Sequence, residues 1–379
     1  MSRSHASNNS EIELSRHGFE RIAAFDKERN ETIPVNALEK IRKIAPKFRE
    51  QFMETGTADC VRQFVCSMAP YPTTFAFNRA YSGLNIFMFF NNRATLVQFK
   101  QNGATKNLLF NPFFPELSEK SGFYQHLKNA WWAKPLPETL LVKRMPSIIE
   151  QLKDAGIEAE DIDYLSYDHL HVQDMRPLMG TTTPEGKTIL KPLFPNAKFL
   201  FHRAEWESVM HLHPHNAVWY VKDGFDNVNT DKLLLYEGDL QLGPGVALMH
   251  TPGHTAGNHS LYLNTSSGTF TISENGVGPD CYNPEHSAVS GLRKTAKWKG
   301  WEVILNANTT DFIFDQYNSM IKEKLLSGPC QLNPDFNNHH SSSEFTTWHA
   351  AAPGLKPTWE HGSVNTGDLV TKERKSQDS

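Results

Sequence analysis

Two short segments carry the residues of this chain that are best suited to chemistry. His169 and His171 form a His-x-His pair directly after an apolar run of strand length. Residues i and i+2 of an extended segment point to the same side, so both imidazole rings can reach one ion. His254 leaves a Pro-Gly turn after a second predicted strand, and that turn can hold its ring at a sheet edge. A His-x-His pair alone is weak evidence for a metal site, so its meaning depends on the sequence around it.

The chain around these histidines alternates between strand and helix patterns. An antiparallel opening sheet is predicted from runs at 73–77, 85–90, 94–100 and 106–111. Later strands are predicted at 163–167, 197–202, 233–237, 245–250, 259–264, 268–273 and 301–307. Helices are predicted at 37–45, 145–155, 203–212 and 314–326. Hairpin signals such as Asn102-Gly103 occur between the elements, which favours a layered α/β sandwich over an all-parallel sheet.

Two segments resemble the metallo-β-lactamase superfamily. LKDAGIEAEDIDYLSYDHLHVQD, at 152–174, is similar to that family's approach to its HxHxDH motif. EGDLQLGPGVALMHTPGHTAGNHSLYL, at 237–263, is similar to the segment of its third histidine, and TPGHTAG is the most specific part. The resemblance runs from about 85 to 326 and implies a four-layer αββα sandwich. We therefore expect a helical N-terminal extension at 1–60, the αββα domain at 61–330, and a C-terminal tail at 331–379 packed on the domain.

The resemblance also implies a set of metal ligands. His169, His171 and His254 match the three histidines of the family's first metal position. The second position departs from the family, because Gln173 and then Asp174 stand where the motif has Asp and then His.

Two further positions differ as well. Glu274 stands in place of the bridging Asp, and Asn308 is the residue nearest to the place of the last histidine. Asp174 and Glu274 keep the family's count of two carboxylates, so we expect one or two divalent metal ions. Zinc is implied by the resemblance, whereas an oxygen-rich second position favours iron or manganese.

These residues predict a metal-dependent hydrolase of an ester, lactone, thioester or related bond, acting through a metal-activated water. Asp174 and Glu274 are the predicted catalytic residues, because Gln173 cannot accept a proton. One alternative is an iron-dependent redox or oxygen enzyme on the same fold. A second alternative is a catalytically degenerate scaffold that binds a small molecule or a partner. The absence of the motif's Asp, its following His and the last His favours this alternative.

Other residues have simpler interpretations. Asp168 is expected to cap its loop or to support a ligand. A second histidine-rich run (His211, His213, His215) lies at the end of a predicted helix and in a Pro turn, and we do not expect it to bind metal. The histidines of the tail (His339, His340, His349, His361) are expected to be solvated, although one of them could replace the missing ligand. Large aromatic residues are more often part of the core than of a substrate pocket. We therefore expect core positions for Phe113, Phe114, Trp131, Trp132 and Trp219.

The amino-acid composition limits the classes of partner that the chain is expected to bind. The 379 residues carry 38 basic and 42 acidic side chains without a charged block, which gives no reason to expect nucleic acid or an anionic membrane as a partner. The four cysteines have no metal or redox spacing and are expected to be buried free thiols. A polar N-terminus and the absence of a long apolar run predict a cytoplasmic protein. We expect a small-molecule substrate and leave homo-oligomer formation open.

Overall fold

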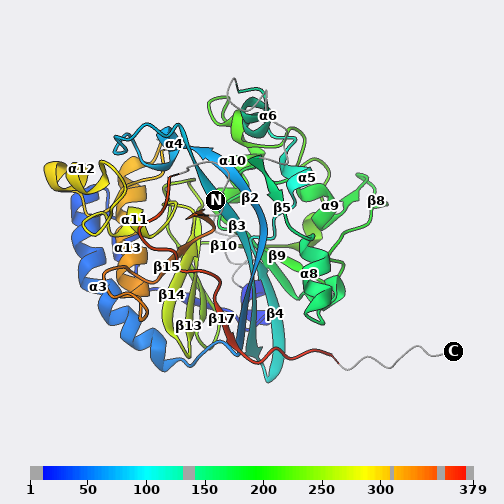
Figure 1. The fold of residues 1–379 in the computed structure, drawn as a ribbon. Helices are drawn as coiled ribbons and strands as arrows, with labels where there is room; N and C mark the ends of the chain where they lie inside the picture. Colours follow the sequence, from blue (N-terminus) through cyan, green and yellow to red (C-terminus); the bar gives the residue numbers. More distant parts are fainter. Residues whose placement is uncertain (1–11, 131–140, 308–310, 348–354, 373–379) are drawn as a thin grey trace.

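The computed structural model describes residues 12–130, 141–307, 311–347 and 355–372. Two β-sheets face each other, and helices cover the outer face of each sheet (Figure 1). The first sheet has the order β1 (Glu20–Ile22), β11 (Asp239–Gly243), β12 (Val246–His250), β13 (His259–Thr265), β14 (Gly268–Ser273) and β15 (His339–Ser341). This arrangement confirms the predicted αββα sandwich.

The second sheet is larger and mixed. Its order is β10 (Leu233–Tyr236), β9 (Lys198–His202), β6 (Tyr164–Ser166), β4 (Ala104–Phe110), β3 (Phe87–Gln101), β2 (Cys60–Pro72) and β17 (Asn365–Gly367). Two short strands join it from the side, β16 (Ser343–Thr346) on β3 and β5 (Lys143–Arg144) on β2. The hairpin between β3 and β4 turns at Asn102 and Gly103, which have φ angles of 49° and 80°, as the Asn-Gly signal predicted.

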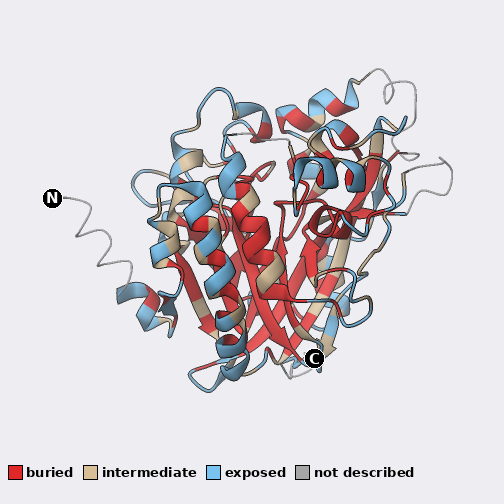
Figure 2. Ribbon diagram, turned by 90° about the vertical axis from the view of Figure 1, so that its left-hand side faces the viewer, coloured by how far each residue is buried: buried red, intermediate tan, exposed pale blue. Residues whose placement is uncertain are grey.

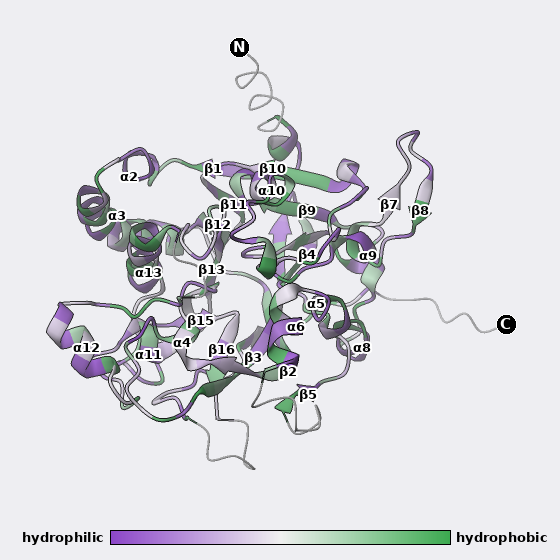
Figure 3. Cartoon of the chain, turned by 90° about the horizontal axis from the view of Figure 1, so that it is seen from above, coloured by the Kyte–Doolittle hydropathy of each residue, from purple (hydrophilic) through white to green (hydrophobic). Residues whose placement is uncertain are grey.

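Helices form the two outer layers. α3 (Pro34–Glu54) and α13 (Ile313–Ser327) pack together over the first sheet, whereas α8 (Ile148–Asp154) and α10 (Arg203–Met210) lie on the second. Figure 3 shows both helical layers from above. Shorter helices lie in the connections, namely α2 (Asp26–Arg29), α4 (Thr73–Ala76), α5 (Pro115–Ser118), α6 (Gly122–Lys128), α9 (Met175–Met179), α11 (Pro279–Tyr282) and α12 (Leu292–Lys299). A small hairpin joins β7 (Thr181–Thr182) to β8 (Thr188–Leu190).

Successive side chains of a strand point to opposite faces of the sheet, so the core is divided into layers. Leu261 and Leu263 of β13 point between the sheets, where they join a core made of residues from both sheets. Tyr262 points the other way and stacks on Phe52 of α3, with 4.3 Å between the ring centroids. Figure 2 shows the result as buried strands behind helices that are exposed only on their outer faces. The four cysteines are buried and free, as predicted.

The N-terminal segment is part of the sandwich. The sequence predicts a short helix at 37–45 that Pro46 would end, yet α3 runs on for 21 residues and contains this proline. Proline lacks an N–H and normally breaks a helix. The apolar stripe continues on both sides of it, from Ala37, Ile41 and Ala45 to Phe48 and Phe52, and burial of this stripe holds the helix together.

Three predicted local structures differ from those observed. Residues 73–76 form the helical turn α4, where a strand was predicted at 73–77. The run Asn91–Arg93, expected to interrupt a strand, lies inside the 15-residue strand β3, where partners on both sides satisfy its backbone. Residues 301–307 form no strand. The edge of β14 that such a strand would occupy is taken by β15.

The C-terminal segment is more than a tail packed on the surface. β15 pairs in parallel with β14 of the first sheet (Figure 1), and β16 pairs antiparallel with β3 of the second (Figure 3). β17 then pairs with β2. The segment therefore connects the two sheets. Among the described residues, no helix combines the length and apolar character needed to cross a bilayer.

Candidate metal centre

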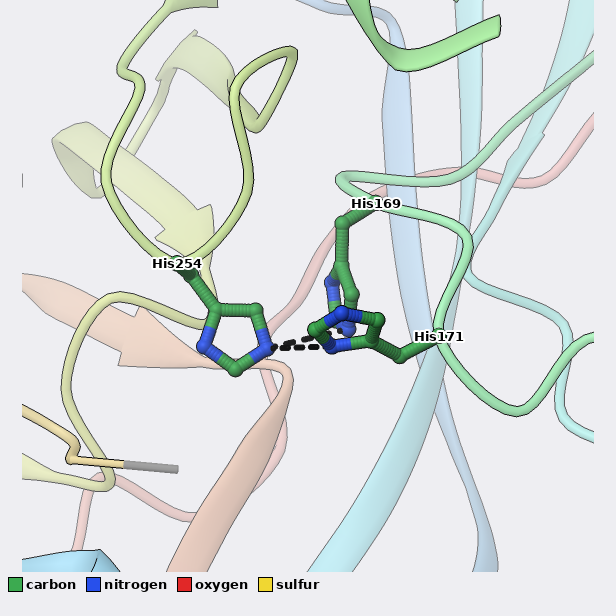
Figure 4. A group of neighbouring side chains, drawn as sticks. All are labelled: His169, His171 and His254. Atoms are coloured by element: carbon green, nitrogen blue, oxygen red, sulfur yellow. Dashed lines mark hydrogen bonds between the residues drawn. The ribbon is translucent and has the colours of Figure 1, made fainter. Parts of the chain in front are cut away.

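His169, His171 and His254 meet at one end of the two sheets (Figure 4). His169 and His171 lie on the loop after β6, and His254 lies on the loop between β12 and β13. The three side chains offer one nitrogen each, and these atoms all lie within 4.8 Å of one another. The sequence prediction that the three rings converge is confirmed.

The spacing of the ring nitrogens suits a tetrahedral ion. His254 Nε2 lies 3.1 Å from His171 Nδ1 and 3.2 Å from His169 Nε2. Ligand atoms at about 2.05 Å from a tetrahedral zinc ion lie about 3.3 Å apart, so the observed distances differ from this by only about 0.2 Å. Burial lowers the pKa of His171 and His254 well below the ordinary value. Both rings are therefore neutral near pH 7 and have a lone pair available for a metal ion.

Asp168 fixes the orientation of the first histidine. Its Oδ1 lies 2.7 Å from His169 Nδ1, and an ionised carboxylate can only accept, so Nδ1 carries the proton. That tautomer leaves the lone pair on Nε2, the nitrogen that faces the other two histidines. Burial opposes the charge of Asp168, but the interaction with His169 and a hydrogen bond from Ser342 keep its pKa below the ordinary value. The predicted role of Asp168 as support for a ligand agrees with these contacts.

The TPGHTAG segment contains two glycines because other elements approach its backbone closely. Gly253 has a φ angle of 150°, and a Cβ atom there would lie 2.2 Å from the Cα atom of Gln316 in α13. A Cβ atom on Gly257 would lie 2.1 Å from the backbone nitrogen of Glu205 in α10. The two glycines let the His254 loop sit between these helices, which fixes its position.

Glu205 ties the two histidine loops together. Its Oε1 accepts a hydrogen bond from the backbone of Leu170 at 2.8 Å, and its Oε2 accepts one from the Thr255 hydroxyl at 2.5 Å. Leu170 lies between the first two histidines, and Thr255 follows the third. Glu205 is completely buried, and burial raises the pKa of its carboxyl. The sequence alone does not point to Glu205, because one glutamate in a helical pattern carries no signal of what it contacts.

A second buried glutamate supports the His254 loop from behind. The His254 N–H donates to Asn275 Oδ1 at 3.0 Å, and Asn275 in turn donates to Glu323 of α13 at 2.9 Å. Glu323 also accepts hydrogen bonds from Ser260, Ser273 and Tyr282. The sequence offers no sign of this network either, since residues that are hydrogen-bonded to each other in it lie up to 63 residues apart.

Comparison with known proteins places these observations in context. No family model matches the chain. A curated N-acyl homoserine lactonase from Bacillus sp. is 34% identical over 119 residues, which are 31% of this chain and 39% of the lactonase. An N-acyl homoserine lactonase from Bacillus thuringiensis is 30% identical over 118 residues, with the same coverage of 31% and 39%. The matched part thus spans about two fifths of the length of these relatives.

The chain has the four-layer αββα architecture that the resemblance to the metallo-β-lactamase superfamily implied. Two facing sheets with outer helices carry a His-x-His loop and a third histidine at one end, as the resemblance implied. A solved N-acyl homoserine lactone hydrolase, with the product N-hexanoyl-L-homoserine at its catalytic metal centre, is 18% identical. It aligns with a TM-score of 0.45 over 70% of this chain and 87% of that one.

Asp174 departs from the ligand set that the metallo-β-lactamase fold implied. It caps α9, and its two oxygens each accept a hydrogen bond from the Arg176 guanidinium at 2.8 Å. Lys120 lies 3.4 Å from the same carboxylate. Although burial opposes it, these contacts hold the pKa of Asp174 below the ordinary value. Asp174 lies outside the group formed by the three histidines.

Glu274 lies in the wall of the cavity that the three histidines face. Its Oε2 accepts a hydrogen bond from the backbone of Ser343 at 2.8 Å. Burial and the nearby charge of Asp168 raise its pKa well above the ordinary value. Gln173 lines the same cavity, whereas Asn308 lies outside the described residues.

The histidine cluster lies between two hollows. A cavity of about 80 Å³ has many aromatic rings in its wall, among them Phe113, Phe123 and Trp219. Trp219 also packs against His171, with 5.8 Å between the ring centroids. Of the aromatic residues singled out from the sequence, Phe114 is buried against Phe194, and Trp131 and Trp132 lie outside the described residues.

The second hollow is a surface groove of about 580 Å³. His171 and His254 form part of its wall together with the histidine-rich run, His211, His213 and His215. These three side chains are exposed, and none belongs to the histidine group. They line an approach to the cluster instead.

The tail histidines were expected to be solvated, and for two of them this is wrong. His339 and His340 are buried. His339 stacks on Tyr282 at 3.8 Å, and His340 stacks on His361 at 4.3 Å, so aromatic packing replaces hydration. None of these three belongs to the metal-competent group, and His349 lies outside the described residues.

Proposed function

We propose that this chain is a metal-dependent hydrolase that opens a lactone or a related ester. One observation supports this above the others: three histidine nitrogens from two separate loops lie at the spacing of metal ligands, beside a cavity and an open groove. The curated relatives are named N-acyl homoserine lactonases, which makes a lactone the first substrate class to test.

The donor set fits one divalent ion. His169 and His254 would bind it through Nε2 and His171 through Nδ1, since these atoms face one another. Three neutral imidazoles suit zinc, and an ion bound by three protein ligands keeps a position for water. When bound, such an ion lowers the pKa of its water and polarises a carbonyl group.

The remaining roles fall to residues of the two hollows. Asp168 would keep His169 in the tautomer that binds metal. Glu274 is the carboxyl group in the cavity wall that is not bound in an ion pair, and we assign it the proton transfer. We assign no proton transfer to Asp174, because Arg176 donates hydrogen bonds to both of its oxygens. The groove would admit the substrate.

The iron-dependent alternative loses its main support. It depended on an oxygen-rich second position built from Asp174 and Glu274. Asp174 is bound by Arg176 and Lys120 instead, so this position is short of one of its two expected carboxylates.

The test compares three proteins purified without added metal: the wild type, His254→Ala, and His286→Ala, whose exposed histidine lies outside the site. We expect about one divalent ion per wild-type chain and hydrolysis within a panel of lactones and simple esters. Both should be lost in His254→Ala and kept in His286→Ala. A wild type that binds no metal would contradict the proposal and favour a binding scaffold. Bound iron with oxygen consumption would favour the redox alternative.

A further inference from the structure

The C-terminal segment crosses from one sheet to the other directly beside the histidine cluster. β15 ends at Ser341 on the edge of the first sheet, and β16 begins at Ser343 on the second. Ser342 therefore lies at the crossing point, where its N–H donates to Ser273 at 3.0 Å and its carbonyl accepts from Arg93 at 3.0 Å. These contacts with both sheets hold the backbone of Ser342 in place.

The side chain of Ser342 contacts the residue that orients the first histidine. Its hydroxyl donates to Asp168 Oδ2 at 2.5 Å, while the other oxygen of Asp168 accepts from His169. Asn111 completes the arrangement, because its amide donates to Ser342 Oγ at 2.7 Å and its oxygen accepts from the Asp168 N–H at 2.9 Å. Both oxygens of the carboxylate are thus fixed, so the carboxylate cannot rotate away from His169.

The same segment also contacts the second acid of the cavity. The backbone of Ser343 donates to Glu274, and Asn92 of β3 donates to the Ser343 hydroxyl at 2.9 Å. Two adjacent serines of the C-terminal segment thus contact the two acids of the cavity wall, Ser342 contacting Asp168 and Ser343 contacting Glu274.

We propose that Ser342 is a positioning residue of the metal centre, through which the C-terminal segment completes the site. This inference rests on the proposed metal-binding function. Without the Ser342 hydroxyl, Asp168 Oδ2 would be buried without that donor, and the carboxylate could turn. His169 would then lose its fixed orientation and bind metal more weakly. Loss of such a supporting contact typically weakens metal binding about 10- to 100-fold.

The test measures the affinity of the full-length chain for Zn²⁺ and Co²⁺ by competition with a chelator, and records the visible absorption spectrum of the Co²⁺ form. Ser342→Ala should bind at least about 10-fold more weakly and show an altered Co²⁺ spectrum. The matched control is Ser341→Ala, since the neighbouring Ser341 is equally buried but donates to the backbone of Gly276. This control should bind as the wild type does. Should Ser342→Ala fail to fold, Ser342→Cys retains a weaker donor and should also lose affinity.

A double-mutant comparison separates positioning from a general loss of structure. If Ser342 acts through Asp168, adding Ser342→Ala to Asp168→Asn should weaken binding no further than Asp168→Asn alone. Additive losses, or a Ser342→Ala protein with the affinity and spectrum of Ser341→Ala, would overturn the inference while leaving the proposed function intact. Failure of the wild type to bind either ion would overturn both.

Discussion

Glu205→Ala is the substitution that best tests how the two histidine loops are held together. The completely buried carboxylate links the loop of His169 and His171 to the loop of His254, through Leu170 on one side and Thr255 on the other. Alanine removes both acceptors at once and leaves two donors buried. We expect losses of both stability and metal affinity.

The size of the effect follows from these two contacts. A buried donor left without a partner costs about 1–3 kcal/mol, so the two together cost about 2–6 kcal/mol. That is a large fraction of a typical unfolding free energy of about 5–15 kcal/mol. Glu205→Gln should cost less, because the amide keeps one acceptor and the Thr255 hydroxyl can turn to accept from its NH₂ group.

The assay is urea unfolding with and without Zn²⁺, combined with a metal-affinity measurement. Metal that binds only the folded state adds stability, and a weaker site should add less. Glu207→Ala is the matched control, since Glu207 lies on the same helix and is exposed. A Glu205→Ala protein with the stability and affinity of Glu207→Ala would refute the idea that this contact holds the loops together.

Two further predictions concern charge. Asp174→Asn should leave the number of metal ions per chain unchanged, because Asp174 is bound to Arg176 and lies outside the histidine group; loss of an ion on metal analysis would restore it as a ligand. Burial lowers the pKa of His250 from 6.5 to about 4, whereas the unfolded chain keeps a value of about 6.5. The unfolded state therefore takes up the proton first, and stability falls as the pH drops from about 6.5 towards 4, by about 3 kcal/mol for this residue. His250→Gln should lose less stability than the wild type between pH 7 and 4.5 in urea unfolding, and an equal loss would contradict the reasoning.

The sequence by itself determined the layered fold and the three histidines. Strands such as β12 are short apolar runs of strand length between turn residues, and such a run can be recognised from the sequence alone. The turn before His254 was predicted from Pro252 and Gly253 for the same reason. These features are local, so they are visible without knowing what packs against them.

Only the tertiary structure decided what surrounds the histidines. Asp174 has the type and position of a ligand, but Arg176 and Lys120 bind it, and the sequence does not show which charges will meet. Glu205 and Ser342 are far in sequence from their hydrogen-bond partners in the first loop. Glu205 is 35 residues from Leu170, and Ser342 is 174 residues from Asp168. The chain at 339–346 reads as a polar tail, yet it supplies strands to both sheets, because the free edges of β14 and β3 offer unpaired backbone groups that its own backbone can satisfy. Contacts of this kind depend on the assembled fold and leave no pattern in the sequence.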